Sequence, residues 1–126
     1  MSKKSTLLFF LALAIVLGAF GAHGLKKLVD AERIESFKTG VMYHLIMTVA
    51  LMVARFSGDF SSSKSSAIRL VFIGVCLFSG SIYLLVFNAI FNWPINAFIG
   101  PITPIGGVLM IAGWLKMAWL YFKQGE

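Results

Sequence analysis

The chain has 126 residues, of which 59% are hydrophobic and only 13% are charged. Soluble domains carry about one quarter charged residues, so this composition excludes an ordinary water-soluble protein. The net charge of +6 comes from Lys and Arg scattered near the ends of apolar runs, which argues against a nucleic-acid-binding face and indicates membrane orientation signals. We expect one domain, 1–126, because two separate cores would each be too small to fold.

The distance between charged residues predicts the first two membrane spans. A bilayer core of about 30 Å requires on the order of 20 helical residues with few or no charges. The uncharged run 5–22 predicts span one over about 6–22. The next uncharged run is shorter, but the flanking Lys38 and Arg55 can extend to the headgroups, which predicts span two over about 37–56.

Two polar segments flank span two. Segment 24–36 mixes four apolar residues with six charged ones, which is typical of a short amphipathic helix lying at the membrane interface between spans one and two. Segment 57–66 consists mainly of serine and predicts a flexible polar loop.

The second half of the chain contains a run, 70–115, without Asp, Glu, Lys or Arg. It is too long for one crossing, and Pro94, Pro101 and Pro104 near its middle favour a turn. We therefore predict span three over about 68–91 and span four over about 105–122. Only helices satisfy their backbone groups within one apolar segment, so the fold class is all-α, an integral membrane bundle of four transmembrane helices.

Two questions about the ends of the chain follow from this topology. A cleaved signal peptide is an alternative for span one, but its apolar run is longer than a usual signal core. With four crossings, seven of the eleven Lys and Arg lie on the side of the termini, which predicts that both termini are cytoplasmic. The first connection is nevertheless unusually basic for an outer loop.

Small residues at helical spacing form a stripe in each span, and such stripes let helices approach closely in lipid. The predicted packing residues are Gly18 and Ala22 in span one, Gly40 in span two, Gly74, Gly80 and Ser81 in span three, and Gly106 and Gly113 in span four. They predict a closely packed bundle.

A candidate polar cluster follows from chain direction, because alternate helix ends lie on the same side of the membrane. The residues at that side are His23, Tyr43, His44, Asn88 and Thr103. Glu32 or Glu35 could join them from the interfacial segment. Ionisable groups at membrane depth are costly and often functional. The competing interpretation is that His23 flanks span one at the headgroups and His44 only donates a hydrogen bond to a neighbouring helix.

Five motifs carry a family resemblance: 18–25 (GAFGAHGL), 37–44 (FKTGVMYH), 78–84 (FSGSIYL), 100–107 (GPITPIGG) and 112–114 (AGW). Through them the chain resembles the domain of unknown function 423 family, the YgdD-like bacterial inner-membrane proteins related to eukaryotic transmembrane protein 256. The resemblance implies a multi-pass, four-helix protein of the bacterial cell inner membrane, and it supplies no reaction or ligand. The motif positions carried over, without a known role, are His23, Thr39, Gly40, Tyr43, His44, Ser79, Gly80, Pro101, Thr103, Pro104 and Gly106.

Three classes of function compete. We favour a structural or interaction protein, a membrane-complex subunit or membrane-homeostasis factor, with membrane lipid and a homo-oligomer or other membrane protein as partners. The alternative is a small transporter or channel that uses the polar cluster around His23, His44 and Asn88, although no acidic residue lies within a span to drive proton exchange. An enzyme is disfavoured because catalytic motifs are missing, and we expect no metal and no cofactor.

Overall fold

The computed structural model describes residues 2–58 and 61–125, and within them every long element is a helix. The four long helices are α1 (Lys3–His23), α2 (Ala31–Phe56), α3 (Ser62–Phe91) and α5 (Ile102–Lys123). Two short elements lie in the connections, the 3-10 helix η1 (Leu25–Lys27) and α4 (Asn96–Ile99). Each long helix is long and apolar enough to cross a membrane. The predicted all-α fold with four spans is confirmed.

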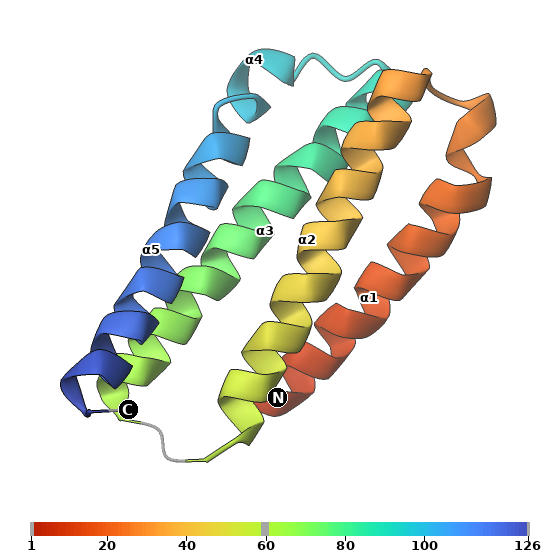
Figure 1. Cartoon of the computed structure of the whole chain (residues 1–126). Helices are drawn as coiled ribbons and strands as arrows, with labels where there is room; N and C mark the ends of the chain where they lie inside the picture. Colours follow the sequence, from red (N-terminus) through yellow and green to blue (C-terminus); the bar gives the residue numbers. More distant parts are fainter. Residues whose placement is uncertain (1, 59–60, 126) are drawn as a thin grey trace.

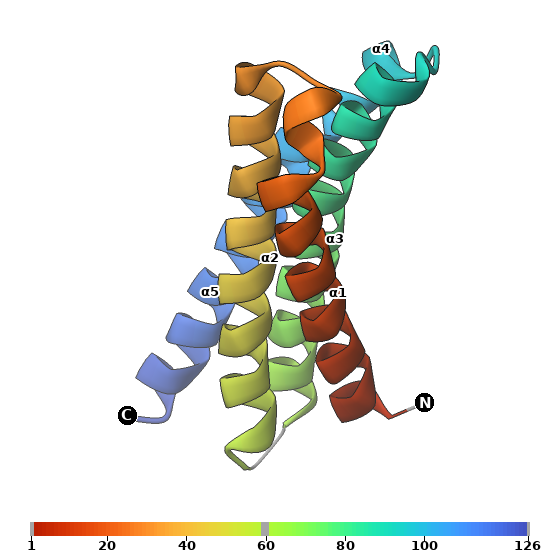
Figure 2. The same cartoon turned by 90° about the vertical axis from the view of Figure 1, so that its right-hand side faces the viewer.

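The four long helices stand in a row in which neighbours in sequence are neighbours in space. α1 packs on α2, α2 on α3, and α3 on α5 (Figure 1). Figure 2 looks at the row from the side of α1 and shows the two termini at the same end of the bundle. η1 and α4 lie at the opposite end (Figure 1). The structure therefore has the even number of crossings that the charge-free runs predict.

Side-chain caps account for where three of the helices begin. Ser2, Asp30 and Ser61 each accept a hydrogen bond from the backbone N–H three residues further on. Such caps satisfy donors that the first helical turn leaves unpaired. Because Ser61 caps α3, the polar loop predicted over 57–66 is shorter than expected. Two of its residues, 59 and 60, lie outside the described residues.

The connection between α1 and α2 also differs from expectation. Segment 24–36 does not form a separate interfacial helix, because η1 covers a single turn and α2 already begins at Ala31. The break is stabilised by Leu25, which is fully buried in a cluster with Phe37, and by Asp30, which caps α2. The charged part of the segment is therefore the first turns of span two.

The prolines mark the turn between spans three and four, although the last helix starts earlier than predicted. α3 ends at Phe91, where Asn92 adopts the left-handed conformation with φ 54°. α5 begins directly after Pro101, so that Pro104 lies within its first turn. Proline is tolerated there because the first backbone N–H groups of a helix have no partner within it. The expected start at residue 105 is thus a few residues late.

Candidate functional site

Helices α3 and α5 make the closest helix contact in the molecule, and three glycines allow it. A Cβ atom at Gly74 would lie 2.7 Å from a backbone nitrogen of α5 and 2.8 Å from the carbonyl oxygen of Gly106. A Cβ at Gly106 would meet the backbone of Phe78, and one at Gly113 would meet Val71. Backbone atoms cannot rotate away, so these positions require glycine for this packing.

The other predicted packing residues occupy more varied surroundings. Gly18 and Gly40 face side chains of the neighbouring helix, at 3.2 Å and 3.1 Å from the position of a Cβ. At Gly80 no heavy atom of a neighbouring element lies within 4 Å of that position. Ala22 is exposed to the surroundings. Close helix contact is therefore concentrated at the α3–α5 pair.

His44 is the most enclosed residue of the candidate polar cluster, with 1% of its surface exposed. Its Nδ1 lies 2.9 Å from the hydroxyl oxygen of Tyr83 in α3. Its ring packs on Phe10 of α1, with ring centroids 4.1 Å apart. Nε2 is buried and has no hydrogen-bond partner among the described residues. Through this one side chain, α2 contacts both α1 and α3 at the centre of the bundle.

Two serines of α3 form further hydrogen bonds between helices. Ser79 donates to the backbone carbonyl of Gly40 in α2 at 2.7 Å. The hydroxyl of Ser81 lies 2.5 Å from that of Thr103 in α5. Together with Tyr83, these side chains connect α3 to the helices on both sides of it. Such bonds between helices stabilise association in lipid, where no water competes for the polar groups.

The structure does not gather the candidate polar cluster at one point. His23 is exposed at the end of α1, and Tyr43 is half-buried with its ring on Phe78. Asn88 is buried beside the start of α2, near Asp30 and Arg33, away from the His44–Tyr83 pair. Thr103 contacts Ser81, as described above. The five residues therefore belong to several separate contacts.

The two carboxylates expected to join the polar cluster, Glu32 and Glu35, lie at the surface of the bundle. Glu32 borders a surface hollow that Thr103 also lines. Glu35 is exposed, and its Oε1 accepts a hydrogen bond from the ammonium of Lys38 at 3.2 Å. Within the part of the chain that the structure describes, no group of three His, Cys, Asp or Glu could hold a metal ion.

Two residues of these contacts belong to the motif 78–84, where Ser79 was carried over without a role, but neither was included in the candidate polar cluster. Ser79 and Tyr83 lie one helical turn apart in α3 and both face α2, through Gly40 and His44. A spacing of four residues between polar side chains in an uncharged span is the signal that could have found them.

The sequence of this chain matches, over residues 17–107, the family model described as Protein of unknown function (DUF423). The chain belongs to the DUF423 family. The resemblance to this family is thereby confirmed, and four of the five motifs lie within the matched region. The matched region of this DUF423 protein contains the His44–Tyr83 pair and the contact between Gly74 and Gly106, while Gly113 lies beyond it.

Individual DUF423 relatives are similar over most of the chain. The UPF0382 membrane protein YwdK of Bacillus subtilis is 41% identical over 108 residues, which cover 83% of both proteins. A UPF0382 membrane protein of Haemophilus influenzae is 35% identical over 87% of this chain and 85% of its own length. A UPF0382 membrane protein of Schizosaccharomyces pombe is 36% identical over 83% and 88%. No solved structure matches this chain. Relatives described as membrane proteins are thus found in bacteria and in a yeast.

Proposed function

We propose that this DUF423 protein is a structural or interaction protein of the membrane, which acts by associating with lipid and with a membrane-protein partner or a second copy of itself. The observation that carries the proposal is that buried polar groups within the spans form hydrogen bonds between helices. His44, Ser79 and Ser81 are buried, and each one makes a hydrogen bond with a neighbouring helix. A site that binds a substrate needs such groups directed into an open space.

The outer helices of the row supply the surface for association. On α1 the side chains of Phe9 and Val16 are 68% and 63% exposed, and on α5 those of Val108 and Ile111 are 64% and 61% exposed. No other long helix among the described residues packs on either of these faces. Lipid covers apolar faces of this kind, and a second bundle can replace the lipid where surfaces fit. The exposed faces of α1 and α5 are therefore two surfaces at which another bundle can bind.

We place the protein in the bacterial cell inner membrane with both termini in the cytoplasm. Seven of its eleven Lys and Arg belong to the end of the bundle that holds the termini. Lys116 contributes to this end, because its ammonium donates a hydrogen bond to Ser66 at the start of α3, at 2.8 Å. An excess of cations on the cytoplasmic side is the usual orientation signal. Bacterial relatives support the choice of membrane.

Cysteine cross-linking in native membranes tests the association. In a Cys76→Ser background, Ile111→Cys and Val16→Cys place a thiol on the two outer faces. Met110→Cys is the matched control, because Met110 is adjacent to Ile111 but only 5% exposed, in the α3–α5 contact. We expect cross-linked species from at least one outer position and none from the control.

A second experiment tests for partners of a different sequence. The unmodified full chain is purified in a mild detergent, and the proteins that co-purify with it are identified by mass spectrometry. A defined oligomer or a stoichiometric partner would support the proposal. A strictly monomeric chain that carries no partner and gives no cross-links would contradict it.

A further inference from the structure

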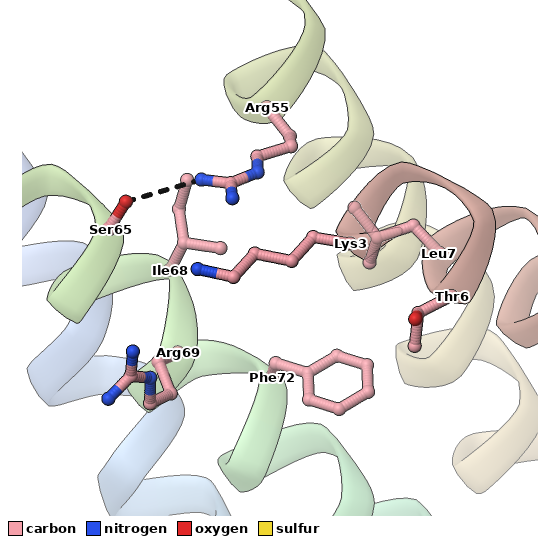
Figure 3. A pocket seen from close by; sticks show the side chains of 8 residues that line it. All are labelled: Lys3, Thr6, Leu7, Arg55, Ser65, Ile68, Arg69 and Phe72. Atoms are coloured by element: carbon pink, nitrogen blue, oxygen red, sulfur yellow. Dashed lines mark hydrogen bonds between the residues drawn. The ribbon is translucent and has the colours of Figure 1, made fainter. Parts of the chain in front are cut away.

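A pocket of about 170 Å³ opens between three helices at the end of the bundle that holds the termini (Figure 3). Its cationic side chains are Lys3 from α1, Arg55 from α2 and Arg69 from α3. Its apolar wall is formed by residues such as Leu7 and Phe72. The pocket thus combines a charged rim with an apolar interior between α1 and α3, two helices whose backbones do not approach closely and which meet only through side chains such as Phe10 and Phe72.

The rim of this pocket is complementary to an anion. None of the residues that line it is acidic. The acidic residues that the structure describes, Asp30, Glu32 and Glu35, all belong to the connection and first turns of α2 at the opposite end. α1 and α3 also begin at the pocket end, and the positive end of each helix dipole adds partial charge there. An anion at this site meets positive charge from three helices.

The fold holds one cation of the rim, Arg55, in place. Arg55 is half-buried and donates a hydrogen bond from Nη1 to the hydroxyl of Ser65 in α3, at 3.2 Å. The side chain of Lys3 extends from α1 across the pocket toward α3 (Figure 3). A guanidinium is planar and carries N–H donors in an arrangement that suits phosphate oxygens. The rim is therefore prepared for a phosphate group.

The interior of the pocket is suited to hydrocarbon. Leu7 and Ile68 are only 5% and 8% exposed, so they form a fixed wall. The ring of Phe72 packs on Phe10 of α1 with centroids 4.9 Å apart, deeper in the membrane than the rim. A free phosphate ion would use the rim alone. A molecule with a phosphate headgroup and an acyl chain would use both the rim and the wall.

We propose that this pocket binds an anionic phospholipid, whose phosphate contacts Lys3, Arg55 and Arg69 and whose acyl chain lies against Leu7 and Phe72. The bound lipid connects the first half of α1 to α3, a connection that the backbones do not make. This inference goes beyond the proposed function, because it concerns one lipid site on the chain itself and holds whether the chain acts alone or in an assembly.

Native mass spectrometry of the full chain in detergent micelles tests the site, with phosphatidylglycerol, phosphatidylcholine and inorganic phosphate as probes. We expect phosphatidylglycerol to bind at least severalfold more tightly than phosphatidylcholine. Each cation near an anionic lipid surface contributes about a fivefold factor in affinity. The variant with Lys3→Gln, Arg55→Gln and Arg69→Gln should therefore lose most of this preference. Millimolar inorganic phosphate should not displace the lipid.

A matched control removes the same charge from the same end of the bundle but outside the pocket. Lys4→Gln, Lys64→Gln and Lys123→Gln serve for this, because these three lysines do not line the pocket and instead lie over aromatic rings. We expect this variant to keep the preference for phosphatidylglycerol within about twofold. If both variants lost the preference for phosphatidylglycerol equally, general surface charge would explain the preference and the proposal would be overturned.

Two further variants keep the test decisive if the triple substitution disturbs folding. Arg69→Gln changes one exposed side chain and should lower the affinity for phosphatidylglycerol about fivefold. Thr6→Phe fills the pocket while leaving all three cations in place, and it should weaken lipid binding without changing the binding of phosphate. Equal affinity for both lipids in the wild-type chain, or full displacement by inorganic phosphate, would contradict a phospholipid site.

Discussion

The two outer helices of the row are attached to the inner helices in different ways. α5 meets α3 at Gly74 and Gly106, where backbone lies against backbone. α1 meets α2 through side chains, since the space beside Gly18 is filled by Val41 and the space beside Gly21 by the ring of Phe37. A backbone contact cannot relax, whereas a side chain can change its rotamer. One edge of the bundle therefore has a fixed register, and the other is adaptable.

The largest effect is expected from Gly106→Ala. The added methyl group would overlap the backbone of Phe78 and the carbonyl oxygen of Gly74, so α5 would have to move away from α3. We expect the free energy of unfolding to fall by about 3 kcal/mol, the upper range for overpacking. Unfolding of the purified protein by steric trapping in bicelles measures this change.

Gly80→Ala is the control for that substitution. Gly80 is also a glycine of the α3–α5 pair of helices, but it has no neighbouring atom within 4 Å of the added methyl. We expect a change of no more than about 0.5 kcal/mol, and alanine could even stabilise the helix by its higher propensity. If both alanines destabilised the protein equally, close backbone contact would not be the reason for glycine at 106.

A smaller effect is expected at the contact between the inner helices. Tyr83→Phe removes the hydroxyl that pairs with His44 Nδ1 and leaves a buried nitrogen without this hydrogen bond. We expect a loss of about 1 kcal/mol in the free energy of unfolding, in the range for hydrogen bonds between membrane helices. The same steric-trapping measurement applies.

Tyr43→Phe is the matched control for Tyr83→Phe, because Tyr43 packs through its ring on Phe78 and is only half-buried. We expect this control to change the stability by less than about 0.5 kcal/mol. A loss as large as that of Tyr83→Phe would show that the cost comes from any tyrosine hydroxyl in the bundle and not from the pair with His44.

The smallest effect is expected from Gly18→Ala, at the adaptable edge. The added methyl would lie 3.2 Å from Cγ1 of Val41, a side-chain atom that can shift by a few tenths of an ångström. We expect the stability to change by less than about 0.5 kcal/mol. A loss comparable to that of Gly106→Ala in the same unfolding measurement would remove the distinction between the two edges.

The number of spans and their approximate positions could be predicted because the thickness of the bilayer sets a length that charged residues reveal. The errors lie at helix ends. Asp30 caps α2 and Ser61 caps α3, so both helices begin several residues earlier in the chain than predicted. α5 also begins earlier, because its first turn accommodates Pro104. Local hydrogen bonds and proline chemistry decide these ends, and hydropathy does not detect them.

The candidate site was harder to predict because chain direction gives the depth of a residue in the membrane but not the direction of its side chain. His44 and Asn88 were placed in the same half of the bilayer, yet the first packs on α1 and the second lies beside the start of α2. Gly74 and Gly80 both belong to the small-residue stripe of span three, but only Gly74 faces α5 closely. Rotation about the helix axis is set by packing with neighbours, which a single sequence does not contain.

The order of helices in the row has a consequence for how the chain is made. Each long helix packs on the one that precedes it in the sequence. A helix that leaves the ribosome and enters the bilayer therefore finds its docking surface already in place, and no later segment must push between two earlier ones. Contacts of short sequence separation form quickly. Membrane insertion and tertiary assembly can thus proceed together, one hairpin after the other, during translation.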